Sequence, residues 1–315
     1  MTLSAVFPGQ GSQSPGMLSE LAQEHSQITE TFSEASDLLG YDLWDLCQNA
    51  DAEKLRQTEI TQPLMFVSGI AVWRVWQQLG GATPVIMAGH SLGEYTALTA
   101  AGALTFAKAV PLVALRGKLM TGAVGAGVGG MAAVIGMDDD AVRQMCEELT
   151  TPEGIVEAVN FNSPGQVVIS GHISALENAC AVAKERGARK AIMLPVSVPN
   201  HSSLMEPARA ELADAIAAAK LRMPDIPVMQ NADATIPADV EILRRSLQSH
   251  VVNPVHWTST IQKMKELGIV SQVELGPGKV LAGLCKRIDK SIAGMPVENS
   301  ATLAKALETT AEVGN

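Results

Sequence analysis

The stretch "PVIMAGHSLGEYTALTAA" (residues 84–101) places a strand, a tight turn and a helix in direct succession. The apolar run Pro84–Ala88 predicts a buried strand, and residues 94–101 predict a helix. Ser91 stands between them in the pattern Gly-x-Ser-x-Gly, which is typical of a turn that exposes a serine nucleophile at the edge of an α/β sheet. A serine that only caps the helix is the alternative interpretation. The fitting strand and helix on either side favour the catalytic one.

Strands and helices alternate along most of the chain, which predicts a mainly parallel sheet covered by helices, as in α/β-hydrolase-like domains. The tail after about Ala293 is expected to be peripheral, with a helix near residues 301–307. The expected strands are Leu3–Phe7, Ile226–Gln230 and Ile269–Glu274, and the expected helices are Gln62–Leu79, Phe106–Met120, Glu241–Ser249 and Ser259–Leu267.

The middle of the chain has a different pattern, which begins after the glycine-rich residues 122–130. Its apolar runs and turn residues give the order β-α-β-β-α-β, which is typical of a small ferredoxin-like unit. We therefore expect an inserted subdomain over residues 128–197. The larger catalytic domain then comprises residues 1–127 and 198–315.

The composition is that of a globular protein and limits the classes of partner. The 315 residues are 47% hydrophobic and 18% charged, which excludes a disordered chain. The net charge of −10 disfavours nucleic acid. No stretch approaches the roughly 20 apolar residues of a membrane span, so we expect a cytoplasmic protein. Four scattered cysteines (Cys47, Cys146, Cys180 and Cys285) indicate neither a zinc site nor a disulfide framework.

A serine needs a base to attack at neutral pH, and six histidines are available. His90 is a poor partner because adjacent side chains point apart. His201 ends the strand-like segment "LPVSVPNH" (194–201), and such strand ends are where open α/β sheets build their sites. His250 stays a second possibility. No triad acid is evident, so a backbone carbonyl is expected to hold the imidazole tautomer.

Seven segments together resemble the bacterial malonyl-CoA:acyl carrier protein transacylase family. They occur in order over nearly the whole chain, and the set is far more specific than any one of them. The segments are "FPGQGSQ" (7–13), "GHSLGEY" (89–95), "LRGKLM" (115–120), "VNFNSPGQVVISG" (159–171), "PVSVPNH" (195–201), "NPVHW" (253–257) and "ELGPGKVL" (274–281).

The resemblance implies a role for each candidate residue. Ser91 is the nucleophile that becomes malonyl-serine, and His201 is the general base and then the general acid. Gln10, with the backbone N–H of Leu92, resembles the oxyanion hole. Arg116 matches the arginine that binds the malonyl carboxylate, although a structural ion pair would otherwise be the simpler interpretation of a helix arginine.

Two positions depart from the family pattern. His250 stands where the family usually has glutamine, whose backbone carbonyl orients the catalytic histidine. Asn200 stands where serine or phenylalanine is common, next to the catalytic histidine. Neither change removes the mechanism, but both alter the surroundings of the base.

The implied reaction is a ping-pong transfer of malonyl from malonyl-CoA to holo acyl carrier protein, which supplies fatty acid synthesis. No metal or bound cofactor is expected, and the family suggests a monomer. A serine hydrolase or thioesterase is one alternative, and an acyltransferase of polyketide synthesis or malonate decarboxylation is another. The acidic carrier protein would dock on basic residues, for which the candidates are Lys184, Arg186, Arg189, Lys190, Lys286 and Arg287.

Overall fold

The computed structural model describes residues 2–311 and contains two separate sheets. All pairings in the five-stranded sheet are parallel, which confirms the expected α/β class. Its strand order is β7 (Val228–Met229), β2 (Ile86–Gly89), β1 (Thr2–Phe7), β8 (Ile269–Leu275) and β9 (Ala293–Val297).

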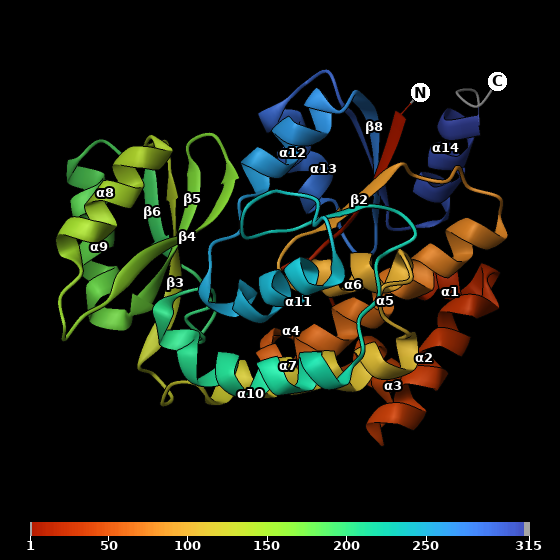
Figure 1. Cartoon of the computed structure of the whole chain (residues 1–315), viewed down its shortest axis with the longest axis horizontal. Helices are drawn as coiled ribbons and strands as arrows, with labels where there is room; N and C mark the ends of the chain where they lie inside the picture. The colour runs from red at the N-terminus through yellow and green to blue at the C-terminus, as the bar shows by residue number, and fades with distance from the viewer. Residues whose placement is uncertain (1, 312–315) are drawn as a thin grey trace.

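Alternate residues of the central strands pack into two different apolar cores, because successive side chains of a strand point to opposite faces. Ala5, Phe7 and Met87 belong to the larger core. Val6 and Ala88 belong to the other core, on the side of α12 (Trp257–Glu266) and α13 (Val280–Ile288). Helices therefore cover both faces of the sheet, as Figure 1 shows.

The remaining helices of this larger unit lie around the sheet (Figure 1). In chain order they are α1 (Ser19–Glu24), α2 (Ser26–Leu39), α3 (Leu43–Asn49), α4 (Ala52–Arg56), α5 (Thr58–Gln78), α6 (Gly93–Ala100), α7 (Phe106–Gly122), the short 3₁₀ turn η1 (Ser203–Met205), α10 (Glu206–Ala218), α11 (Val240–Ser249), η2 (His250–Val252) and α14 (Ser300–Ala311). None of the described helices is long and apolar enough to cross a membrane.

The second sheet is antiparallel and lies at the left of Figure 1 with two helices. Its elements follow the expected order β-α-β-β-α-β. They are β3 (Gly129–Ile135), α8 (Asp139–Leu149), β4 (Val156–Ser163), β5 (Gln166–His172), α9 (Ile173–Glu185) and β6 (Lys190–Met193). The strand order β4-β5-β3-β6 is that of a ferredoxin-like unit. The exact boundaries of the inserted subdomain, 128 and 197, stay a prediction.

The end of β4 fastens the small sheet to the larger unit. The Phe161 N–H donates to the Val255 carbonyl at 2.9 Å, and the Val255 N–H donates to the Val159 carbonyl at 2.7 Å. The Phe161 ring stacks on His256, with centroids 5.3 Å apart and planes 4° from parallel. His256 therefore joins the two units.

The expectation of a peripheral tail was wrong. Residues 293–297 form β9, which pairs with β8 from Ser271↔Ala293 to Leu275↔Val297 and extends the central sheet. The helix that follows, α14, buries Leu303 and Ala306 in the larger core. An edge strand that includes Gly294 and Pro296 has little of the alternation by which strands are found in a sequence.

Candidate active site

Ser91 lies at the turn between β2 and α6, with a left-handed backbone at φ 52°. The turn is so tight that a Cβ at position 89 would lie 1.8 Å from the Gly93 carbonyl carbon. A Cβ at position 93 would lie 2.1 Å from the Phe7 carbonyl oxygen. Glycine is therefore required at both places, and the serine is held at the carboxyl end of the sheet.

His201 faces Ser91 from the segment before η1. Its Nε2 is 2.7 Å from the Ser91 Oγ. Its Nδ1 lies 3.0 Å from the His250 carbonyl and 3.1 Å from the Asn253 carbonyl. A carbonyl oxygen only accepts hydrogen bonds, so Nδ1 carries the proton and Nε2 is free to accept the serine proton. Asn253 was not predicted to take part.

Burial and the nearby Arg116 cation lower the pKa of His201 to about 3. The imidazole is 2% exposed and has no carboxylate on Nδ1. Two backbone carbonyls thus fix its orientation and tautomer, which is the work of the acid in a serine triad.

Arg116 comes from α7 and is 1% exposed. Its Nη1 donates to the Gln62 Oε1 at 2.7 Å, and its Nη2 lies 3.5 Å from the Ser91 Oγ. The Nε has no hydrogen-bond partner among the described residues, and none of their carboxylates forms an ion pair with the guanidinium. A buried cation of this kind leaves room for an anionic group beside the nucleophile.

Two backbone N–H groups beside Ser91 are available to an oxyanion. Neither the Gln10 nor the Leu92 amide donates a hydrogen bond to any described residue. The Gln10 side chain points elsewhere and donates to the Thr58 Oγ1 at 3.3 Å. Gln10 and Leu92 both line the cavity that contains Ser91.

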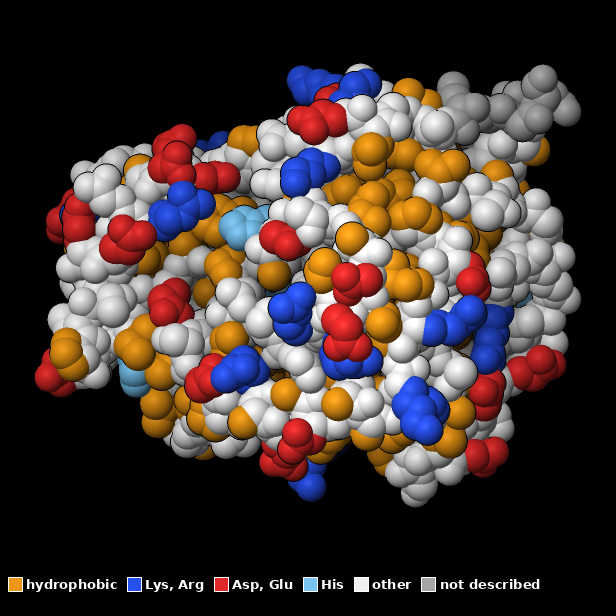
Figure 2. Space-filling view, viewed as in Figure 1, with side chains coloured by type: hydrophobic (Ala, Val, Ile, Leu, Met, Phe, Trp, Pro, Cys, Tyr) orange, Lys and Arg blue, Asp and Glu red, His pale blue; other side chains and the backbone are white. Residues whose placement is uncertain are grey.

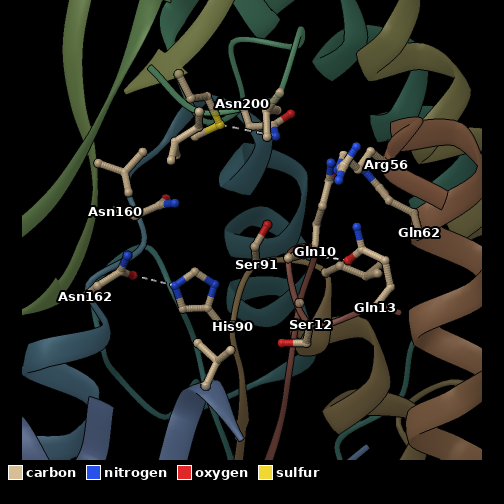
Figure 3. Close-up of a pocket in the computed structure, with 18 of the residues that line it drawn as sticks. Gln10, Ser12, Gln13, Arg56, Gln62, His90, Ser91, Asn160, Asn162 and Asn200 are labelled. Atoms are coloured by element: carbon tan, nitrogen blue, oxygen red, sulfur yellow. Dashed lines mark hydrogen bonds between the residues drawn. The ribbon is translucent and has the colours of Figure 1, made fainter. Parts of the chain in front are cut away.

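These groups line a cavity of about 480 Å³, which is large enough for a small ligand. Figure 3 shows Ser91 at its centre, Gln10, Gln62 and Arg56 on one side, Asn160 and Asn162 on the other, and Asn200 at the top. Asn160 and Asn162 come from β4, so the small sheet forms the second wall. The sequence did not single out Gln62, Arg56 or these two asparagines as site residues.

Two further histidines, His90 and His250, lie near the site. His90 points away from the serine chemistry, and its Nε2 lies 2.8 Å from the Asn162 Oδ1 (Figure 3). The His250 side chain is buried, with its Nδ1 3.7 Å from the Glu94 Oε2. Burial lowers the pKa of His250 well below its ordinary value, so this imidazole is neutral.

Three of the six basic residues considered for docking lie near one end of the small sheet. Lys190 starts β6 and Arg189 precedes it, while Arg287 lies on α13 and its Nη1 donates to the Gln166 Oε1 at 2.5 Å. Gln166 and Lys190 both pair with Ile135, so these groups lie at the same end of the small sheet. Gln166 also lines the cavity.

The other three candidates contribute less to such a group. Arg186 forms an ion pair with Glu148 at 2.7 Å, which offsets its charge. Lys184 and Lys286 are exposed. On the face shown in Figure 2, basic and acidic side chains are intermingled, so charge of one sign does not dominate that face.

Known proteins resemble this chain over nearly its full length. The sequence model of the acyl transferase domain matches residues 5–311. Malonyl CoA-acyl carrier protein transacylase of Salmonella typhimurium is 50% identical over 303 residues, which cover 96% of this chain and 97% of that protein. The crystal structure of an acyl carrier protein S-malonyltransferase from Vibrio cholerae has a TM-score of 0.93 at 47% identity and covers 97% of this chain and 99% of its own. A malonyl-transacylase solved with a type II polyketide acyl-carrier protein has a TM-score of 0.96 at 46% identity, covering 98% of this chain and 100% of its own.

Proposed function

The chain belongs to the malonyl-CoA:acyl carrier protein transacylase family, and we propose that the residues around Ser91 carry out that transfer. The enzyme moves the malonyl group of malonyl-CoA to the phosphopantetheine thiol of acyl carrier protein. It is a serine acyltransferase that supplies malonyl units for fatty acid synthesis. No step of this reaction needs a metal or a bound cofactor.

The single observation that carries the substrate assignment is the position of Arg116. Its guanidinium is buried beside Ser91, and no carboxylate of the described residues lies within ion-pair distance of it, although the Glu94 carboxyl group acts on it from further away. The free carboxylate of a malonyl group supplies that anion and can accept two parallel hydrogen bonds. An acetyl group cannot, so the arginine selects a diacid.

The first half of the reaction loads the serine. His201 Nε2 takes the Ser91 hydroxyl proton as Oγ forms a bond to the thioester carbon. The oxygen of the tetrahedral intermediate takes its negative charge next to the N–H groups of Gln10 and Leu92. The C–S bond then breaks, and the CoA sulfur leaves with the proton held by His201.

The second half reverses these steps with a different thiol. The pantetheine thiol of acyl carrier protein gives its proton to His201 and attacks the malonyl-serine carbon. The bond to Ser91 Oγ breaks, and the serine oxygen recovers the proton. The acyl group has then changed carriers with no net gain or loss of protons.

The malonyl carboxylate also helps the base. The Arg116 cation disfavours a protonated His201 in the empty site. A bound carboxylate neutralises that cation and makes the imidazolium easier to form. Serine activation is thus coupled to the presence of the correct acyl group.

Acyl carrier protein approaches, in this proposal, at the end of the small sheet where Arg189, Lys190 and Arg287 lie; Gln166, to which Arg287 donates, lines the cavity. A relative solved with its acyl-carrier protein supports a partner of this class. We further propose that the enzyme is a monomer and works in the cytoplasm, where its four buried free cysteines stay reduced.

A serine hydrolase would use the same turn but would be expected to have a triad acid and an apolar acyl pocket without Arg116. The carbonyls on His201 Nδ1 and the arginine beside Ser91 favour the transferase. An acyltransferase of polyketide synthesis shares every one of these features, and the acceptor protein alone distinguishes it.

Labelled malonyl-CoA tests the proposal. After brief incubation, peptide mapping should find malonyl on Ser91, and holo acyl carrier protein should remove it much faster than water does. Ser91→Ala is the control and should carry no label. Rapid hydrolysis of the label, or label at another residue, would contradict the transferase.

A further inference from the structure

Asn231 spans the turn that carries the nucleophile. It lies two residues beyond β7, and its side-chain Oδ1 accepts the Ser91 N–H at 2.8 Å. Its Nδ2 donates to the Gly89 carbonyl at 2.7 Å. One amide group therefore satisfies a donor and an acceptor of the turn, on either side of His90.

Glu94 decides which way that amide faces. The Glu94 Oε2 accepts the Asn231 backbone N–H at 2.9 Å and also accepts the Nδ2 group. If the amide turned over, its Nδ2 would face the Ser91 N–H and its Oδ1 would face two oxygens. The carboxylate therefore selects one orientation of Asn231, and both side chains are buried, at 0% and 3% exposure.

This arrangement has a consequence for the oxyanion hole. Because the Ser91 N–H is bonded to Asn231, it is not available to the substrate. The next N–H along the chain, that of Leu92, has no acceptor among residues 2–311. The amide of Asn231 thus fixes the plane of the peptide before Ser91 and leaves the Leu92 N–H for the substrate.

We propose that Glu94 and Asn231 are positioning residues that hold the left-handed turn of Ser91 in its reactive form. The proposal rests on the proposed function, because it assigns these residues to the same acyl transfer. It predicts that the hydrogen-bond acceptor at position 94 matters, and that its negative charge does not. Burial already raises the pKa of Glu94 to about 7.

Two variants of similar size distinguish the hydrogen-bond acceptor at position 94 from its negative charge. Glu94→Gln keeps an oxygen that can accept both N–H groups of Asn231, whereas Glu94→Met keeps the volume and loses the acceptor. The readout is the rate at which a fluorophosphonate labels Ser91, measured with the full chain. We expect Glu94→Met to react about tenfold to a hundredfold more slowly, and Glu94→Gln within about threefold of the parent.

Steady-state kinetics give a second readout. Both variants remove the Glu94 charge that acts on Arg116, so any change in the KM for malonyl-CoA should be the same in both, while kcat should fall only in Glu94→Met. A loss of fold alone would lower the amount of active enzyme, which titration with the fluorophosphonate measures directly. Labelling of folded Glu94→Met at the parental rate would overturn the proposal, and so would a Glu94→Gln variant as slow as Glu94→Met.

If Glu94→Met does not fold, exchanging the acid at position 94 and the amide at position 231 provides a second test. Asn231→Asp alone places two acids in contact and should slow labelling. Asn231→Asp combined with Glu94→Gln restores a donor between the two side chains, but the Gly89 carbonyl still lacks the Nδ2 donor. The double variant should therefore label faster than Asn231→Asp alone and more slowly than the parent, and a double variant no faster than Asn231→Asp would contradict the proposal. The fluorophosphonate needs no malonyl group, so failure of the proposed function would appear as absent malonyl loading in the parent, with the order of the variants unchanged.

Discussion

The proposed nucleophile and base, Ser91 and His201, both have left-handed backbones, at φ 52° and 65°. This conformation costs of order 1–3 kcal/mol for a residue other than glycine, and it persists only where the surroundings enforce it. Asn231 holds the first residue, and the His250 and Asn253 carbonyls hold the ring of the second. The surrounding packing therefore stabilises a geometry that each residue alone would not adopt.

Replacing Arg116 tests the link between acyl recognition and the base. Arg116→Gln should load malonyl about a hundredfold or more slowly, because it loses charge-assisted hydrogen bonds to the carboxylate. Its relative activity with acetyl-CoA should rise. Since the Arg116 cation lowers the pKa of His201, its removal raises that pKa, and the acidic limb of kcat/KM for acetyl-CoA moves to higher pH.

The matched control is Arg209→Gln, because Arg209 is an exposed arginine of α10 paired with Glu206. It should change neither the acyl preference nor the pH profile. An Arg116→Gln variant that still prefers malonyl-CoA to acetyl-CoA would remove the arginine from acyl recognition.

At the scale of elements, the junction of β1, β2 and α6 tolerates no extra atom. Gly93→Ala would place a Cβ 2.1 Å from the Phe7 carbonyl oxygen, so the first turn of α6 must shift away from β1. We expect a loss of about 1–3 kcal/mol in the free energy of unfolding. Serine labelling should fall as well, because the shift displaces Ser91.

Gly283→Ala in α13 is the control for that change. A Cβ there would meet nothing within 4 Å, and the glycine lies inside a helix. This variant should gain about 0.5–1 kcal/mol in urea unfolding and keep full activity. Equal effects of the two substitutions would contradict the steric account.

The start of β6 provides the test of docking. Arg189→Glu combined with Lys190→Glu should raise the KM for acyl carrier protein several-fold and leave the KM for malonyl-CoA unchanged. Only the carrier protein presents a large acidic surface to these residues. Lys305→Glu on α14 is an exposed charge reversal on another element and should alter neither value. A parallel rise in both KM values would argue against docking at this edge.

At the scale of the whole molecule, local patterns predicted the elements well and the contacts between distant segments poorly. The order of elements in the small unit and the helix Phe106–Met120, which the structure has as Phe106–Gly122, followed from periodicity and turn residues. The helices α1, α3 and α4 were missed because each is too short to show a clear period.

The fold brings together candidate site residues that a motif had marked. Ser91 and His201 stand in recognisable segments although 110 positions separate them. Asn231 is 140 positions from Ser91 and lies in no such segment, so only the folded chain brings it to the turn. Glu94 was visible inside "GHSLGEY", but its partner was not, and a role that depends on a partner cannot be read from one residue.

His250 should make the unfolding free energy of the entire protein depend on pH. Its imidazole is buried and neutral, and Glu94, His201, His90 and Arg116 are the titratable and charged groups that face it. Below its ordinary pKa of 6.5 the unfolded chain binds a proton at this residue and the folded chain does not. Unfolding therefore becomes easier as the pH falls below that value.

His250→Gln restores the usual family residue. The unfolded chain then no longer takes up a proton at position 250. The slope of the unfolding free energy against pH should fall by about 1.4 kcal/mol per pH unit in the mildly acidic range. Glu94 acts in the opposite direction, because its raised pKa makes the folded chain hold a proton between 4.5 and about 7, but it is present in both proteins and cancels in the difference. Urea unfolding at a series of pH values measures that difference, and the two curves should run parallel above neutral pH. Parallel curves in acid as well would mean that the folded protein protonates His250 as readily as the unfolded chain does, with the Glu94 carboxylate 3.7 Å away as the group that stabilises the imidazolium.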